Sequence, residues 1–324
     1  MALPEASKKW IVLVARLSVS GGMLWFLLTK LGKESSRPDL PEWNRDTAFW
    51  LTGAALLTLA GIVLSALRWQ AVLRALGQRT RLQRLLSHYL AGQFVANVLP
   101  TTIGGDVLRV TRLSRDSVEA PTSFASVVLE RLTGWIVLPL ITFIGFAVNP
   151  GLRRLGRATQ IALGLSGATL VLLVLMMTAV ASRRYGRIDD ERGWRRFLAA
   201  VAVGLDHLRR HPMQAFNVIV VAFVYQLVLV FAAVMAAHAI GIPAAGPTAL
   251  LAFFPAVAIA QVLPVSISGL GVREGLFVLF LHPLGVPSEQ AVALGLLLYV
   301  LNLVVSLLGA PAFAIGGHRR QAVV

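Results

Sequence analysis

The 324 residues of this chain include no cysteine. This absence excludes disulfide bonds, thiolate chemistry and cysteine-based metal sites. The six histidines are scattered and show no metal-ligand spacing. The sequence also lacks a P-loop and a Ser-His-Asp set, which argues against an ATP-driven pump or a hydrolase. We therefore expect no catalytic residues, no metal and no cofactor.

Charged residues are scarce as well, at 14% of the chain against about a quarter in an ordinary soluble domain. Hydrophobic residues make up 56% of the chain and the mean hydropathy is +0.74. Several apolar runs reach the roughly 20 residues that a helix needs to cross about 30 Å of hydrocarbon. This composition excludes a water-soluble fold. It predicts an all-α polytopic membrane protein with a single transmembrane domain over residues 1–324.

Acidic residues are half as numerous as basic ones, 15 against 30, so the net charge is +15 and the pI is about 11.5. In a soluble protein this balance would favour nucleic-acid binding. Here the arginines stand in short segments beside apolar runs, where membrane topology and anionic lipid headgroups explain them better. We expect no nucleic-acid partner.

The apolar runs predict about six full transmembrane helices. The first run follows Lys8 and Lys9, but it is long and lacks a small-residue cleavage pattern, so we interpret it as a retained span and not as a signal peptide. The predicted spans are 10–31, 48–67, 122–148, 158–181, 215–240 and 290–316.

The distribution of arginine predicts the orientation of these spans, because basic loops stay on the cytoplasmic side. Residues 68–84 and 182–214 are rich in arginine and should be cytoplasmic, whereas 32–47 and 241–248 should face outward. Within 182–214, apolar residues recur at helical spacing and predict an amphipathic helix that ends before Pro212, either an interfacial helix or a plain connector. We expect both termini to lie in the cytoplasm, in the inner membrane of a bacterium.

Two further apolar segments, 85–108 and 249–283, are broken by proline and glycine near their middles. The sides that the arginines predict for the loops are consistent with one another only if each segment enters and leaves the membrane on the same side. The first segment would do so from the cytoplasm and the second from outside. We therefore predict two re-entrant helical hairpins of opposite orientation. The alternative is a Pro/Gly kink in each of two otherwise continuous helices.

The two broken segments form an internal repeat. The runs from Leu99 to Arg109 and from Leu263 to Glu274 both contain Leu-Pro, a hydroxyl residue, Ile, one or two glycines and Arg. Proline stops the incoming half-helix, and glycine allows a tight turn at positive φ with close backbone approach. Two such hairpins inserted from opposite faces are typical of transporters with a binding site at the membrane midplane. The repeat thus predicts a ligand site between the hairpins.

Six charged residues lie in or beside the apolar runs, and each costs about 2.5–3.5 kcal/mol at a helix centre unless it is paired or hydrated. Asp106 and Arg109 should form an i,i+3 pair if the outgoing half-helix is regular. The neighbours Glu130 and Arg131 should point apart and find partners on other segments. We expect the same of Arg273 and Glu274.

Arg109 and Arg273 are candidates for presenting their guanidinium groups to a phosphate. Glu130 and Glu274 would then hold these groups in place or contact a cationic headgroup. The alternative is an ion-pair network that only locks the hairpins, and Asn97 has the similar alternative of capping loop amides. The predicted substrate-binding residues are Asn97, Thr101, Thr102, Gly104, Gly105, Asp106, Arg109, Glu130, Arg131, Ser266, Ser268, Gly269, Gly271, Arg273 and Glu274.

Three stretches resemble one known family: Asn97 through Arg109, Glu130-Arg131-Leu132, and Pro264 through Gly275. Together they resemble the flippase-like transmembrane family, known as the lysylphosphatidylglycerol synthase transmembrane region. The resemblance covers nearly the whole chain and implies a helical bundle with two re-entrant hairpins around a central cavity. The multiple-peptide-resistance members of this family flip aminoacylated phosphatidylglycerol and carry a cytosolic aminoacyl-transferase domain. Because this chain ends at Val324, shortly after its last span, we expect no transferase activity.

These observations predict a lipid flippase or lipid-binding translocase without covalent chemistry. The expected substrate is an anionic or aminoacylated phospholipid, or a polyprenyl-linked lipid. A secondary transporter of a small anion would suit the same hairpins. A third possibility is a membrane scaffold subunit whose partner is a lipid-modifying enzyme.

Overall fold

The computed structural model describes residues 22, 44–98, 104–116, 118–182, 194–242, 245–262 and 269–318. Every regular element in these residues is helical, which confirms the predicted all-α class for this part of the chain. The predicted span 10–31, apart from Gly22, lies outside the described residues. So do Thr101, Thr102, Ser266 and Ser268.

Five helices are long and apolar enough to cross a membrane, and they correspond to five of the six predicted spans. Their exposed side chains include many large apolar residues, such as Leu56, Leu172 and Phe231, as expected for a surface that faces lipid. The long helices are α2 (Arg45–Ala75), α5 (Ala120–Val148), α6 (Arg157–Ser182), α8 (Pro212–Ala239) and α11 (Ser288–Leu307), the last of which continues the span into α12 (Gly309–His318).

Helix α2 differs from its predicted limits. It begins after Asn44, whose side-chain oxygen accepts a hydrogen bond from the Thr47 amide at 2.8 Å, and it runs to Ala75 instead of ending at residue 67. Arg68 was predicted to lie in a cytoplasmic loop, but it is buried within α2. The prediction was wrong because an arginine can remain in an apolar helix when another helix supplies its counter-charge.

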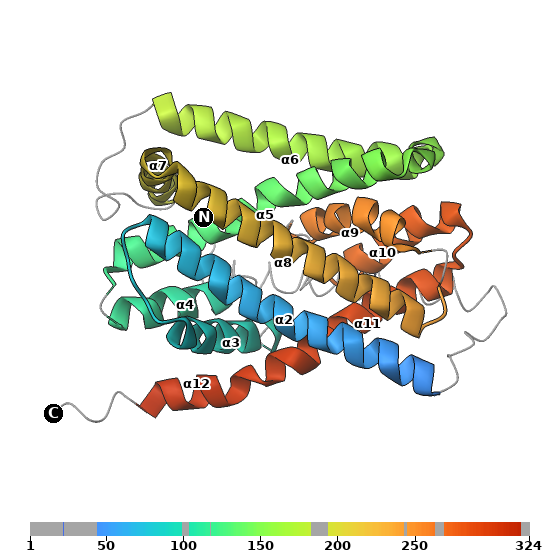
Figure 1. Cartoon of the computed structure of the whole chain (residues 1–324), viewed down its shortest axis with the longest axis horizontal. Helices are drawn as coiled ribbons and strands as arrows, with labels where there is room; N and C mark the ends of the chain where they lie inside the picture. The colour runs from blue at the N-terminus through green and yellow to red at the C-terminus, as the bar shows by residue number, and fades with distance from the viewer. Residues whose placement is uncertain are drawn as a thin grey trace, which may run out of the picture.

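Helices α2 and α8 pack side by side along much of their length and run antiparallel (Figure 1). Glycines on α2 allow the close approach: a Cβ on Gly53 would lie 2.6 Å from the sulfur of Met235, and one on Gly61 would lie 3.0 Å from Leu229. Small residues at such an interface let two membrane helices come near enough for dense packing.

The first broken segment is an antiparallel pair of helices, α3 (Leu82–Val98) and α4 (Gly104–Arg115). Near the break, Ala96 packs against Gly105, and one turn further Gly92 packs against Arg109. A Cβ on Gly105 would collide with the backbone carbonyl of Gly92. The glycine therefore permits close helix packing inside α4, whereas the sequence interpretation stressed a turn at positive φ. Both helices extend slightly beyond the predicted hairpin, 85–108.

The second broken segment is also an antiparallel pair, α9 (Pro247–Gln261) and α10 (Val272–Leu281). The rings of Phe253 and Phe280 stack with centroids 5.0 Å apart, far from the break. At the break, Gly269 and Gly271 have φ values of 75° and 84°, which confirms the expected turn at positive φ. A short 3-10 helix, η2 (His282–Leu284), follows α10.

The two hairpins lie at opposite ends of the long helices (Figure 1). Helices α3 and α4 pack near the C-terminal end of α2, where Tyr89 and Leu85 join Trp69 in one apolar cluster. Helix α9 packs near the C-terminal end of α5, where a Cβ on Gly145 would lie 2.5 Å from the Cα of Ala252. The broken ends of both hairpins therefore approach the middle of the bundle from opposite directions.

The remaining elements close the bundle around these hairpins. Helix α7 (Trp194–Arg210) lies within the predicted amphipathic segment and packs against α5, while η1 (Pro150–Arg154) joins α5 to α6. Helix α12 turns away from α11 and lies against α3. Arg112 of α4 donates hydrogen bonds to the carbonyls of Ala312 and Phe313, each at 2.9 Å, and so ties the first hairpin to α12.

Candidate functional site

A cavity of about 360 Å³ lies at the middle of the bundle, where the ends of both hairpins meet the long helices. Helices α3 and α4 contribute to its wall from one side, and α9 and α10 contribute from the other. Its polar lining residues are Thr58, Ser65, Arg68, Tyr89, Gln93, Asp106, Arg109, Glu130, Arg131, Tyr225, Gln226, Gln261, Arg273 and Asn302.

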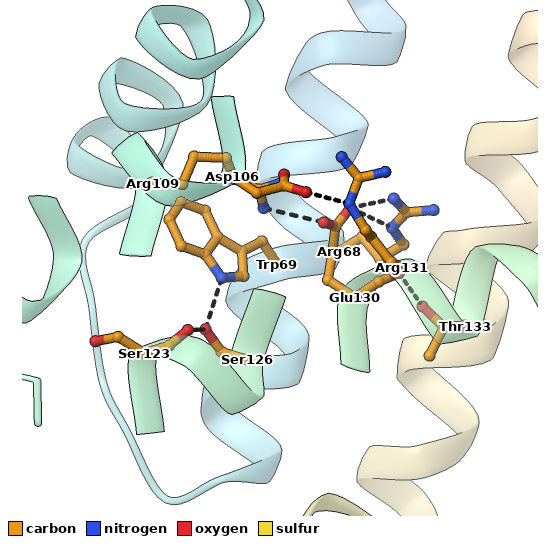
Figure 2. A network of polar contacts seen from close by, with 9 residues as sticks. All are labelled: Arg68, Trp69, Asp106, Arg109, Ser123, Ser126, Glu130, Arg131 and Thr133. Atoms are coloured by element: carbon orange, nitrogen blue, oxygen red, sulfur yellow. Dashed lines mark hydrogen bonds and ion pairs between the residues drawn. The ribbon is translucent and has the colours of Figure 1, made fainter. Parts of the chain in front are cut away.

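Glu130 of α5 is the centre of a network of ion pairs in this wall (Figure 2). One carboxylate oxygen accepts hydrogen bonds from two nitrogens of Arg68 on α2, with Nε at 3.0 Å. The other oxygen accepts from Arg109 on α4 at 3.0 Å. Glu130 therefore links α2 and the first hairpin to α5. Its partners lie on other segments, as predicted.

The two arginines bound to Glu130 also lie over aromatic rings. The Arg109 guanidinium carbon is 4.3 Å from the Trp69 ring centroid and 4.4 Å from that of Tyr89. Arg68 lies 4.6 Å from the Tyr225 ring. Such contacts stabilise a desolvated cation by about 0.5–2 kcal/mol each. Arg109 is thus held from several directions, as expected for a fixed part of the wall.

Asp106 connects the network to a more exposed arginine. Its carboxylate accepts from Arg109 at 3.5 Å, the predicted i,i+3 pair, and also from Nε of Arg131. The Arg131 side chain is 49% exposed, against 6% for those of Arg68 and Arg109. Figure 2 shows its two terminal nitrogens turned away from Asp106. Arg131 is therefore the cation of this group that is best placed to meet a ligand.

Arg273 and Glu274 do not behave as predicted. Arg273 donates from Nε and from a terminal nitrogen to Glu274, at 3.1 and 2.7 Å, although the two are sequence neighbours. The reason is that Glu274 folds back to accept the Gly271 amide at 2.6 Å at the start of α10, which brings its second oxygen beside Arg273. The expectation of partners on other segments was wrong here. Arg273 also lies 5.3 Å from the Tyr299 ring.

One terminal nitrogen of Arg68, Nη1, is buried and has no hydrogen-bond partner among the described residues. It sits next to Gly134, where a Cβ would come within 3.2 Å of it. Leaving a buried donor unsatisfied costs about 1–3 kcal/mol, and more for a charged group. Neighbouring atoms cover this nitrogen, so a ligand in the cavity would reach it only if they moved.

Cations outnumber acids in the described wall. The cavity is lined by four arginines, Arg68, Arg109, Arg131 and Arg273, and by two acids, Asp106 and Glu130. Glu274, which is not a lining residue, neutralises Arg273. One net positive charge remains on this wall. In the part of the chain that the structure describes, no three His, Asp or Glu side chains gather in an arrangement that would hold a metal ion. The wall is thus suited to an anion.

The predicted site residues divide into three groups. Those that line the cavity are Gly105, Asp106, Arg109, Glu130, Arg131 and Arg273. Asn97, Gly104, Gly269, Gly271 and Glu274 are described but are not among the lining residues. Thr101, Thr102, Ser266 and Ser268 lie outside the described residues. The binding role of all of these remains a prediction.

Several wall residues escaped the sequence interpretation. Arg68 was assigned to a loop, and Tyr225 was not among the predicted site residues. Trp69 and Tyr89 enclose Arg109, and Gly134 leaves room for Arg68. Glu130 and Gly134 are one helical turn apart on α5, so both positions face the same neighbouring helix. This spacing is the sequence feature that could have indicated a partner such as Arg68.

Comparison with known proteins agrees with the resemblance seen at the motifs. The sequence matches the family described as "Lysylphosphatidylglycerol synthase TM region" over residues 13–309. No curated protein matches the chain.

Proposed function

Because this chain belongs to the lysylphosphatidylglycerol synthase TM region family, we propose that it is a lipid flippase. In this proposal the central cavity binds the anionic headgroup of a phospholipid or a lipid-linked molecule and moves it across the bilayer. The chain itself performs no covalent chemistry. The observation that carries the proposal is the half-exposed guanidinium of Arg131 in a described wall where cations outnumber acids.

The size of the cavity supports a headgroup as the ligand. Its volume of about 360 Å³ is at the lower end of the 300–1,000 Å³ typical of ligand pockets. This volume suits a phosphate with a small polar substituent, but it does not accommodate two acyl chains. In the proposal these chains stay among the exposed apolar side chains of the long helices while the headgroup crosses.

The hairpin geometry supports movement between two sides. We propose that the first hairpin is re-entrant from the cytoplasm and the second from outside, in the inner membrane of a bacterium. Helix α10 has 10 residues and α4 has 12, too few to cross about 30 Å at 1.5 Å per residue. A ligand between the hairpins would be released to either side when one of them moved away.

The proposed orientation can be tested by labelling, because the chain has no cysteine of its own. Arg79, between α2 and α3, and His282, after α10, are both exposed and stand at the base of the first and second hairpin. In intact cells or oriented vesicles, an impermeant thiol reagent should label His282→Cys from outside and Arg79→Cys only after the membrane is opened. Labelling of both positions from the same side would contradict oppositely inserted hairpins.

Lipid movement can be measured in proteoliposomes that contain headgroup-labelled anionic phospholipid. The intact chain should move the lipid faster than protein-free liposomes do. Arg131→Gln should lower the rate by at least about tenfold, since charge-assisted hydrogen bonds contribute roughly 1.5–3 kcal/mol. In this variant Asp106 still has Arg109 as a partner, so the fold should persist.

The matched control is Arg210→Gln, the same change at a side chain on α7 that is 73% exposed and does not line the cavity. Its rate should equal that of the unchanged protein. No movement above protein-free liposomes would overturn the flippase proposal, and uptake of soluble phosphate in its place would indicate a small-anion transporter. Equal rates for Arg131→Gln and Arg210→Gln would show that the cavity wall is not the transport site.

A further inference from the structure

We infer that the connection between α5 and α6 is a docking surface for an anionic phospholipid, separate from the central cavity. Three exposed arginines stand there, Arg153, Arg154 and Arg157, and we call them the basic turn. The sequence has no acid between residues 149 and 160. In the described part of the chain, the side chains of Arg154 and Arg157 form no hydrogen bond or ion pair. Three positive charges therefore lie at the surface without a counter-charge from the described residues.

The basic turn lies beside the base of the second hairpin. Asn149, at the end of α5, donates from Nδ2 to Oγ1 of Thr248 in the first turn of α9, at 3.1 Å. This end of the bundle is opposite the arginine-rich connection between α2 and α3, which the retention of basic loops in the cytoplasm explains. The same rule disfavours arginine at the opposite end. Topology therefore does not account for the basic turn, whereas an anionic partner does.

The arginines stand on an ordered turn. Arg153 donates from Nε to the carbonyl of Phe146 at 3.2 Å. Leu152 is buried, and its carbonyl accepts from Oγ1 of Thr159 at 2.5 Å. Gly156, which precedes α6, has a φ of 59° and lets the chain turn into that helix. A turn that is already fixed loses little conformational entropy when a partner binds to it.

The surface next to the basic turn is apolar, which favours a lipid over a soluble anion. Helix α6 is the least buried of the five described candidate spans and lies at the edge of the bundle (Figure 1). It begins at Arg157, and the positions that follow on the same face are Ile161, Gly164, Ala168 and Leu172. An acyl chain spans half of about 30 Å of hydrocarbon, or roughly ten residues of helix. This face thus combines charge for a headgroup with an apolar stripe for a chain.

The chemistry of the basic turn selects for net negative charge. Guanidinium groups bind phosphate oxygens through paired, charge-assisted hydrogen bonds. Each basic residue near an anionic membrane surface contributes about 1 kcal/mol, which corresponds to about a fivefold change in binding. A zwitterionic headgroup carries no net charge and gains less. The basic turn should therefore collect anionic lipids, and salt should weaken this preference because the side chains are exposed.

Lipid enrichment at the basic turn can be measured by quenching of a single fluorescent label. Because the chain has no cysteine, the label can be attached at Gln160→Cys, an exposed position in the first turn of α6. The labelled full chain is placed in phosphatidylcholine nanodiscs with increasing amounts of nitroxide-labelled phosphatidylglycerol or nitroxide-labelled phosphatidylcholine. The phosphatidylglycerol should reach equal quenching at a mole fraction at least about fivefold lower. Equal quenching by the two lipids would overturn the inference.

The double variant Arg154→Gln/Arg157→Gln should remove most of this preference without changing the unfolding temperature, since neither side chain has a partner in the described chain. The matched control is Arg81→Gln/Arg84→Gln, which makes the same changes at two exposed arginines of the same spacing at the opposite end of the bundle. It should keep the full preference. Arg154→Lys/Arg157→Lys should keep most of it, because the charge remains. Equal preferences in the two glutamine variants would overturn the inference.

A soluble anion is the other occupant that the experiment can detect. Sodium phosphate should lower the preference no more than sodium chloride of the same ionic strength does. A stronger loss with phosphate would indicate a site for a soluble anion and overturn the assignment to a lipid. The quenching requires no movement of lipid between leaflets. Docking on the basic turn is therefore confirmed or refuted independently of the flippase proposal.

Discussion

The two hairpins share a sequence pattern but are fixed to the molecule by different forces. In the first, Arg109 and Asp106 of α4 form ion pairs with residues of α5, and Glu130 extends the network to α2. In the second, Arg273 pairs with its own neighbour, Glu274. The repeated pattern therefore determines where each hairpin breaks, whereas the partners of its charges depend on the helices beside it.

Apolar packing replaces ion pairs in the second hairpin. Phe253 of α9 is fully buried between Phe280 of α10 and Phe146 of α5, with ring centroids 5.0 and 5.4 Å apart. A bound anion can compete with Asp106 and Glu130 for their arginines, but it has no access to this aromatic stack. We infer that ligand binding acts chiefly on the first hairpin, and that the second serves as the more passive wall.

Removing the central carboxylate should produce the largest effect and test this comparison directly. Glu130→Gln leaves Arg68 buried without a counter-charge and leaves Arg109 with Asp106 alone, and breaking such a buried pair costs about 3–5 kcal/mol. Glu274→Gln removes the charge from a single pair, and its side chain can still accept the Gly271 amide. Thermal unfolding in one detergent should therefore show a much larger loss for Glu130→Gln.

The exposed pair Asp206 and Arg210 on α7 should give the smallest loss of stability when one partner is removed. Its side chains are 57% and 73% exposed, so Asp206→Asn should cost at most about 0.5 kcal/mol. Equal losses for Glu130→Gln and Glu274→Gln would show that the different arrangement of charges in the two hairpins has no energetic meaning.

Close helix packing in the first hairpin should give the next largest effect. In Gly105→Ala the new methyl group would meet the Gly92 carbonyl and the Ala96 side chain, so α3 and α4 must move apart. The cost should approach about 3 kcal/mol, the upper end for overpacking, because backbone atoms yield less than side chains. Gly164→Ala on α6 is the matched control: a methyl group there meets nothing within 4 Å and should be neutral or slightly stabilising. Equal stability of the two variants would refute the tight contact.

Much of this architecture could be predicted from sequence, because hydropathy and proline act locally. Five of the predicted spans appear as helices, four of them within a few residues of their expected limits, whereas α2 continues past residue 67 to Ala75. Helix α3 ends at Val98 and helix α9 ends at Gln261, in each case shortly before the Leu-Pro and glycine pattern that predicted a break. The pairing of Asp106 with Arg109 follows from helical periodicity alone, since residues three apart share a face.

The rest depends on contacts between distant segments. Arg68 remains inside α2 because Glu130, 62 residues away, neutralises it, and no local window reveals that partner. Tyr89 and Trp69 enclose Arg109 only once α2 and α3 are packed together. The pairing of Arg273 with Glu274 was mispredicted because it depends on how Glu274 caps its own helix. Side-chain partners are therefore the part of the site that sequence patterns left open.

Within the two hairpins, the smallest effect should come from the turn at positive φ in the second hairpin. Gly271 precedes α10 with a φ of 84°, so Gly271→Ala should cost about 1 kcal/mol of stability. Gly285→Ala is the control for a positive φ, since its φ is 85° and a Cβ there meets nothing within 4 Å. Its ψ of 11° lies in the left-handed region, whereas Gly271 has a ψ of −46°, so Gly271→Ala should lose at least as much stability by thermal unfolding. Only Gly271→Ala should also slow lipid movement, because the Gly271 amide positions Glu274 and, through it, Arg273 in the cavity wall. Equal transport by both variants would indicate that the second hairpin does not need this turn to shape the cavity, and the contrast between the two hairpins would then be stronger than we propose.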